Sequence, residues 1–226
     1  MPLHLLANIV WHTLAGPQNH FAAGTATARR YAMGFSPIVA FVDVVHPDFD
    51  ALTPYCASGE HFYCGGWAGA TPAGWSLEVD SSALQMIWDR DLPMADPAFN
   101  PVQLDATHVP QMLALVAIAP PGPFAARTIE LGEYYGVFEG TRLVAMAGER
   151  MQAGKLREIS GVCTHPEFQR RGLARRLVAH LIRIELARGQ TPFLHVMQDN
   201  PNARRIYENA GFRPYQEIPV RVLARA

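Results

Sequence analysis

The sequence predicts an α/β fold of the mixed α+β kind, and three observations support this. The chain has 226 residues, 49% apolar and 17% charged, a globular composition long enough to bury a core. Its second half follows the order helix, three antiparallel strands, helix, strand, helix. Pro93, Pro97 and Pro101 punctuate a polar stretch between the halves. We therefore expect an N-terminal section, residues 1–100, and a C-terminal section, residues 101–226.

The N-terminal section is weakly patterned. Ile38 to Val45 reads as a strand. Asp50 to Ala57 and Ser82 to Trp88 are predicted as short helices, the second capped by a serine at its start. No catalytic constellation is visible in this section, so the sequence leaves its role open.

The C-terminal section is patterned more clearly. Leu173, Leu177 and Leu181 recur every four positions, which indicates an amphipathic helix on a sheet. Asn200 and Gly211 are a good first cap and a good terminator for a shorter helix. The predicted strands are Pro101–Leu104, Thr128–Phe138, Arg142–Arg150, Leu156–Thr164 and Phe193–Met197, and the predicted helices are Thr107–Ala119, Gly172–Arg188 and Pro201–Asn209.

Charge is unevenly distributed along the chain. Residues 1–126 hold three Arg and ten Asp or Glu, a net −7, whereas residues 127–226 hold sixteen Arg or Lys and ten Asp or Glu, a net +6. Two solvated surfaces of opposite sign would explain this, but the basic half also suits a phosphate-bearing cofactor. Leu and Val at core spacing among the arginines argue against a nucleic-acid-binding helix. No apolar run approaches the roughly 20 residues of a membrane span.

Cysteine and histidine usage points away from disulfides and metals. Cys56, Cys64 and Cys163 are too few for a disulfide framework, so a reduced, cytoplasmic chain is the simplest interpretation. Cys56, His61 and Cys64 lack a fourth ligand and the spacing of a zinc site. We therefore expect no metal. A monomer or homodimer is expected.

The segment that carries chemistry is VCTHPEFQRRGLA, residues 162–174. A strand ends before Pro166, and a polar loop leads into a helix. Gly172 and Ala174 leave room for a ligand near the backbone. The unpaired N–H groups and partial positive charge of a helix start bind phosphate. A capped helix with an ordinary arginine-rich face is the plainer alternative.

The loop QRRGLA resembles the Q/R-x-x-G-x-G/A signature of the GNAT superfamily of N-acetyltransferases. The resemblance implies a mixed, twisted sheet with antiparallel strands and flanking helices, splayed at the strand that binds acetyl-CoA. It covers residues 101–226, and residues 1–100 are a candidate for a degenerate copy of the same fold. It implies that the coenzyme A pyrophosphate lies on Gln169, Arg170, Arg171, Gly172, Leu173 and Ala174, and the pantetheine arm along Val162, Cys163 and Thr164.

A second segment, LHVMQDNPNARRIYENAGF, resembles the later strand and helix of that superfamily. The resemblance implies that Asn200 contacts the pantetheine arm or holds the loop. It implies that Tyr207 donates a proton to the departing thiolate, although a Tyr before Gly-Phe can also simply close the core.

The general base stays open between two residues. His195 matches the position of a glutamate base in ribosomal-protein alanine acetyltransferases, and imidazole accepts a proton near neutral pH. Glu158, on the preceding strand, could act through water. Both could instead make structural hydrogen bonds, and some such enzymes need no dedicated base. Cys163 is disfavoured as a nucleophile because it lies on the cofactor strand.

The acceptor is expected to be the amine of a small molecule or a peptide, attacking directly in a ternary complex. Its pocket is predicted near the loop Pro120–Phe124, with Tyr134 and Tyr135 as candidate lining residues. A catalytically inactive acyl-CoA-binding sensor or scaffold is the alternative function.

Overall fold

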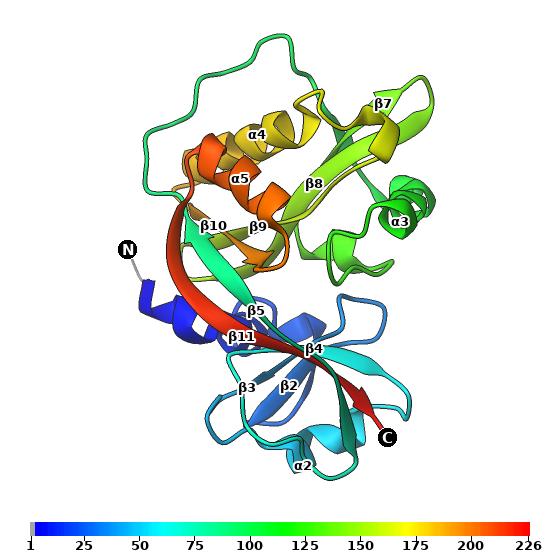
Figure 1. The fold of residues 1–226 in the computed structure, drawn as a ribbon, viewed down its shortest axis with the longest axis vertical. Coiled ribbons are helices and arrows are strands. Elements are labelled where there is room, and N and C mark those ends of the chain that lie inside the picture. Colours follow the sequence, from blue (N-terminus) through cyan, green and yellow to red (C-terminus); the bar gives the residue numbers. More distant parts are fainter. Residues whose placement is uncertain (1–2) are drawn as a thin grey trace.

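The computed structural model describes residues 3–226, and its strands form one mixed sheet with flanking helices (Figure 1). The helices are α1 Ile9–Leu14, α2 Phe49–Leu52, α3 Val109–Ile118, α4 Leu173–Ala187 and α5 Pro201–Ala210. The strands are β1 Ala22–Gly24, β2 Ala28–Tyr31, β3 Ile38–Phe41, β4 His61–Gly65, β5 Trp75–Ile87, β6 Val102–Leu104, β7 Tyr134–Glu139, β8 Arg142–Ala153, β9 Leu156–Thr164, β10 Thr191–Met197 and β11 Arg213–Arg225. Over these described residues the strand order is β1-β2-β3-β4-β11-β5-β10-β9-β8-β7-β6. The predicted mixed α+β class is confirmed.

The elements around the QRRGLA loop form as predicted. β9 has the predicted bounds, and α4 begins after Gly172 and ends before Arg188. Leu177 and Leu181 are fully buried against the sheet, as the four-residue spacing predicts. α5 begins after Asn200, whose side chain accepts from the Ala203 N–H at 3.0 Å.

The prediction of a helix at Ser82–Trp88 is wrong. This segment is the end of β5, where Ala83–Ile87 pairs antiparallel with Phe193–Met197 of β10 and, on its other edge, with β11. Residues 83–87 are buried on both faces of the sheet. A strand buried on both faces shows no polar alternation, so its apolar run is easily taken for a helix.

Further elements differ in extent from the prediction: the strand expected at Ile38–Val45 ends at Phe41, and the one expected at Arg142–Arg150 continues to Ala153. The strand expected from Thr128 begins at Tyr134, because Thr128–Leu131 forms a 3₁₀ turn. The Thr128 hydroxyl accepts from the Ala125 N–H at 2.9 Å, which ties the chain into this turn. The helix expected at Asp50–Ala57 is shorter: α2 ends at Leu52 and passes into a 3₁₀ turn.

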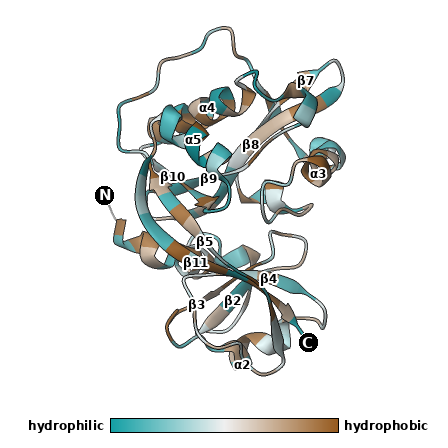
Figure 2. Cartoon of the chain, in the orientation of Figure 1, coloured by the Kyte–Doolittle hydropathy of each residue, from teal (hydrophilic) through white to brown (hydrophobic). Residues whose placement is uncertain are grey.

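One sheet runs through both sections of the chain. β5 belongs to the N-terminal section, yet it lies between β10 and β11 of the C-terminal section. In Figure 1, β5 and β11 pass together from the part that holds α4 and α5 to the part that holds β2, β3 and α2. Figure 2 shows hydrophobic residues along the half of β11 nearest the C-terminus. The predicted boundary near residue 100 falls in the connection from β5 to β6.

Candidate active site

The site begins where β9 and β10 part. These neighbouring strands run parallel but pair only at Leu156–Glu158 with Thr191–Phe193. Beyond that point β10 continues along β5, while β9 continues along β8. The divergence leaves the C-terminal part of β9 without a strand on one side, so its backbone groups face the opening, as the predicted splay requires.

A bulge in β9 shapes this opening. The pairing of β9 with β8 shifts between Met146 and Gly148, and Gly161 there has a φ of 64°. Only glycine adopts this left-handed conformation without strain. A Cβ at Gly161 would also lie 2.9 Å from the ring of Tyr134, which is fully buried. Gly161 therefore serves both the backbone turn and the packing of Tyr134 beneath it.

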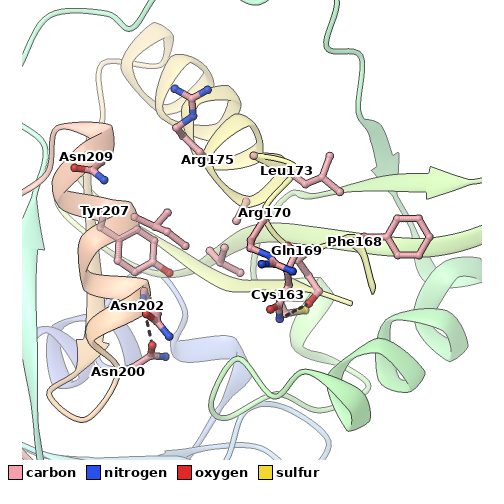
Figure 3. Close-up of a pocket in the computed structure, with 16 residues that line it drawn as sticks. Cys163, Phe168, Gln169, Arg170, Leu173, Arg175, Asn200, Asn202, Tyr207 and Asn209 are labelled. Atoms are coloured by element: carbon pink, nitrogen blue, oxygen red, sulfur yellow. Dashed lines mark hydrogen bonds between the residues drawn. The ribbon is translucent and has the colours of Figure 1, made fainter. Parts of the chain in front are cut away.

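A cavity of about 760 Å³ occupies the divergence (Figure 3). We call it the first cavity. β9 supplies one wall, the QRRGLA loop and the start of α4 a second, and α5 a third. Its lining includes most of the residues predicted to bind the cofactor: Val162, Cys163, Thr164, Gln169, Arg170, Gly172, Leu173, Ala174 and Asn200, together with Tyr207.

One end of the first cavity suits an anion. Gly172 precedes α4 with a φ of 75°, and Arg170 has a φ of 63°, so the loop turns twice through the left-handed region. Within the described residues no side chain caps the start of α4, so its first N–H groups point out of the helix end unpaired. A helix start with these N–H groups and its partial positive charge binds phosphate.

The arginines of this loop lie differently from one another. Arg170 and Arg175 line the first cavity. The guanidinium of Arg171 lies 4.7 Å from the ring centroid of Phe168, and Arg171 is not among the lining residues. Arg171 thus stacks on Phe168, which itself lines the cavity, whereas Arg170 lines the cavity directly, and the sequence R-R does not contain this distinction.

Two polar side chains hold the loops that enclose the first cavity. The side-chain oxygen Oδ1 of Asn200 accepts from the Ala203 N–H and so caps α5, which orders the loop after β10 (Figure 3). The Gln169 side-chain amide donates to the Thr164 carbonyl at 3.4 Å and links the loop to β9. The Thr164 hydroxyl is buried and has no hydrogen-bond partner in the part of the chain that the structure describes.

Tyr207 lies opposite this loop, on α5. Figure 3 shows its hydroxyl turned into the first cavity. Its ring packs edge-on against Phe212, with centroids 6.2 Å apart. Burial, helped by the nearby Cys163 and Glu158, raises the pKa of Tyr207 above its usual value. The phenol is therefore protonated at neutral pH.

Cys163 is unsuited to nucleophilic chemistry. It is buried, and burial raises the pKa of its thiol to about 12. The thiolate is the reactive form, so this side chain is unreactive at neutral pH. The expectation that Cys163 contributes its backbone and a small side chain stays the simpler one.

The two candidate bases are bonded to each other. His195 Nδ1 lies 2.7 Å from Glu158 Oε1, and Arg150 donates two hydrogen bonds to the same carboxylate at 2.9 and 2.8 Å. Burial alone would raise the pKa of Glu158. The charge and hydrogen bonds of Arg150, with the bond from His195, outweigh it and lower that pKa to about 2. Glu158 is therefore a fixed carboxylate.

A buried glutamine fixes the other side of the His195 ring. Gln85, on β5, donates its amide to the Leu6 carbonyl at 3.1 Å and accepts from the Gln216 amide at 2.6 Å. These bonds orient the amide so that its nitrogen faces His195 Nε2 at 2.9 Å. His195 Nε2 is thus the acceptor, and Nδ1–H donates to Glu158. Sequence reasoning missed Gln85, although a lone polar residue in the run ALQMI was a usable signal.

A second cavity, of about 260 Å³, lies on the face of the sheet opposite α4, because His195 and Met197 of β10 line it while Leu194 and Val196 pack with α4. His195 and Asp199 line it, as does the loop Pro121–Pro123, within the segment predicted to border the acceptor. Tyr134 and Tyr135 do not line it, contrary to expectation. Tyr134 is buried beneath Gly161, and Tyr135 packs on His180 of α4 with ring centroids 4.6 Å apart.

Residues 3–226 were also compared with the requirements of a metal site and of a membrane-spanning helix. No group of three or more His, Cys, Asp or Glu side chains is placed to hold a metal ion. No helix there is long and apolar enough to cross a bilayer.

Comparison with known proteins identifies the family. A model described as FR47-like protein matches residues 134–220. A solved structure of a GNAT-family protein from Novosphingobium aromaticivorans is 36% identical, and the match covers 99% of each chain with a TM-score of 0.88. No curated protein matches the sequence.

Two more distant structures share the fold over nearly the whole chain. A GCN5-related N-acetyltransferase from Kribbella flavida is 15% identical, covers 97% of this chain and 94% of its own, and has a TM-score of 0.60. A GCN5-related N-acetyltransferase-like protein from Streptococcus suis is 15% identical, covers 96% and 92%, and has a TM-score of 0.62. The resemblance first drawn from the QRRGLA loop is confirmed, and the chain belongs to the GNAT family of acetyltransferases.

Proposed function

We propose that this chain transfers the acetyl group of acetyl-CoA to an amine, by direct attack within a ternary complex. One observation carries the proposal. The uncapped start of α4, the diverging edge of β9 and the hydroxyl of Tyr207 all border one cavity. These are the parts that anion binding, thioester alignment and thiolate protonation each require.

The first cavity suits the two ends of a long thioester. Its anion end would hold the pyrophosphate on the first N–H groups of α4, with Arg170 and Arg175 nearby. The pantetheine arm would run along β9, where the backbone groups on the edge that β10 leaves open can pair with the amides of the arm.

The transfer step then follows from the residues that border the opening. The amine nitrogen attacks the acetyl carbon, an N–C bond forms, and the C–S bond breaks with its electron pair left on sulfur. Backbone N–H groups near Val162 and Cys163 would stabilise the oxyanion that forms on the way. Tyr207, protonated at neutral pH, would give its proton to the thiolate.

We assign the base to His195 and a positioning role to Glu158. A carboxylate whose pKa is lowered to about 2 is too weak a base for an amine at neutral pH. His195 has its Nε2 lone pair directed at Gln85, and that weak neutral bond can be exchanged for the proton of the acceptor. Glu158 then stabilises the imidazolium through Nδ1–H.

Calorimetric titration with acetyl-CoA tests the proposal first. One saturable site per chain is expected, together with thiol release when amines are added. Gly172→Glu should abolish binding, because the new side chain enters the anion end and carries negative charge. Tyr207→Phe should bind normally and turn over more slowly.

The outcomes of these titrations differ in meaning. Normal acetyl-CoA binding by Gly172→Glu would move the cofactor site elsewhere. Unchanged turnover by Tyr207→Phe would remove this residue from proton transfer. Tight binding with no thiol release for any amine would favour the alternative, an acyl-CoA sensor.

A further inference from the structure

We propose that the second cavity is the acceptor site, and that it takes a small apolar amine lacking a carboxylate, selected by the N-terminal section. This inference rests on the proposed function, since it names the substrate class of the same transfer. It also gives residues 1–100 a role.

The position of the second cavity makes it complementary to the first. Consecutive residues in the loop after β10 line different cavities: Asp199 lines the second and Asn200 the first. His195, also on β10, lines the second cavity only. An amine in the second cavity would therefore lie beside the proposed base, on the face of the sheet opposite α4, and would reach the thioester through the opening where β9 and β10 part.

The N-terminal section builds one wall of this cavity. Val10 comes from α1, Ile38 from β3, Tyr63 and Gly65 from β4, and Val79 and Ala83 from β5. Ile218, Val220 and Val222 of β11 continue the apolar surface. Such a lining favours an apolar body in the substrate.

The charges at this cavity favour a cation and disfavour an anion. Arg150 is the lining residue with positive charge. Its charge is neutralised by the carboxylate of Glu158, to which it donates two hydrogen bonds. Asp199 is exposed and makes no ion pair with any described residue. Its carboxylate would attract an ammonium group and repel a substrate carboxylate.

Size limits the substrate further. The volume of about 260 Å³ lies just below the roughly 300 Å³ at which drug-sized pockets begin. A compact arylalkyl or branched alkyl amine fills such a space, whereas a folded protein surface cannot enter it. The three features together favour a monoamine over an amino acid or a peptide lysine.

Two amines that differ only in a carboxylate provide the matched substrates. The wild-type chain should acetylate 2-phenylethylamine with a kcat/KM at least tenfold above that for phenylalanine or a lysine-containing peptide. Asp199→Asn should reduce the ratio of kcat/KM for 2-phenylethylamine to kcat/KM for phenylalanine to within a few fold. The reason is that the variant loses the attraction for the ammonium group and the repulsion of the carboxylate.

Gly65 offers a test of the wall from the N-terminal section. Its backbone is unstrained, and an added Cβ would have only Ile218 Cδ1 nearby, at 3.7 Å. Gly65→Leu should therefore fold and fill the cavity. It should raise KM for 2-phenylethylamine at least tenfold and leave acetyl-CoA affinity unchanged. Gly65→Ala is the control and should stay within about threefold of wild type.

Direct calorimetric titration with 2-phenylethylamine separates this inference from the proposed function. Saturable amine binding that Gly65→Leu abolishes supports the acceptor site, whether or not acetyl-CoA binds. Equal amine binding by wild type and Gly65→Leu overturns it, as does acetyl transfer that prefers phenylalanine or the peptide. In that last case acetyl-CoA binding and transfer persist, so the proposed function stands. No acetyl-CoA binding at all would sink the proposed function itself.

Discussion

Replacing Gly161 with alanine should damage both stability and the site. The residue has a φ of 64°, and a Cβ there would lie 2.9 Å from the Tyr134 ring. The left-handed conformation costs a non-glycine residue about 1–2 kcal/mol. Forcing an extra carbon into a packed core costs about 1–3 kcal/mol more. We therefore expect Gly161→Ala to lower the free energy of unfolding by about 2–5 kcal/mol.

Gly140 supplies a control for the backbone contribution alone. It has a φ of 59° in the turn between β7 and β8, and a Cβ there would meet nothing within 4 Å. Gly140→Ala should therefore cost only about 1–2 kcal/mol. In a chain of this size each kcal/mol lowers the melting temperature by about 2–4 °C. The larger shift is expected for Gly161→Ala.

Urea denaturation of both variants, followed by acetyl-CoA titration, completes the assay. Gly161→Ala should also weaken acetyl-CoA binding, because relieving the contact with Tyr134 moves the exposed edge of β9. Gly140→Ala should bind as wild type does. Equal stability losses in the two variants would refute the reasoning, since the contact with Tyr134 would then contribute nothing.

Three other predictions follow from the site. Cys163→Ala should keep kcat within a few fold, because burial raises the thiol pKa to about 12; complete loss would instead indicate an acetyl-cysteine route. His195→Gln should lower kcat by about 10²–10⁴ with acetyl-CoA affinity unchanged, and a loss below tenfold would argue against a base there. The pKa of Glu158 is about 2 when folded and about 4.3 when unfolded. Its contribution to stability, on the order of 3 kcal/mol, should therefore be present above pH 4.3 and be lost as pH falls towards 2. Urea midpoints measured from pH 5 to 2 should show this loss, and Glu158→Gln should show a flatter curve.

What the sequence predicts well is local. The bounds of β9 and α4 and the caps of α5 depend on residues within a few positions of one another, so periodicity and capping rules find them. The loop QRRGLA identifies the family for the same reason.

What the sequence does not predict depends on distant partners. β5 becomes a strand because β10 and β11 pair with both of its edges, and the contact of Gln85 with His195 spans 110 positions. The hydrogen bond between His195 and Glu158 is likewise hidden in the sequence, because residues on neighbouring strands do not signal their register. Only the loop geometry shows that Arg170 lines the first cavity while Arg171 stacks on Phe168.

The interleaving of β5 has a consequence for how the chain is made. Synthesis proceeds from the N-terminus, so β5 is finished long before β10 and β11 exist. Until then the apolar side chains of Met86 and Ile87 are not covered and neither edge of the strand is paired. An apolar strand with unpaired edges is prone to associate with other chains. Closing the sheet requires contacts between remote parts of the chain, which slows folding. One edge of β5 therefore stays without its native partner until the thirteen-residue strand β11 has been made.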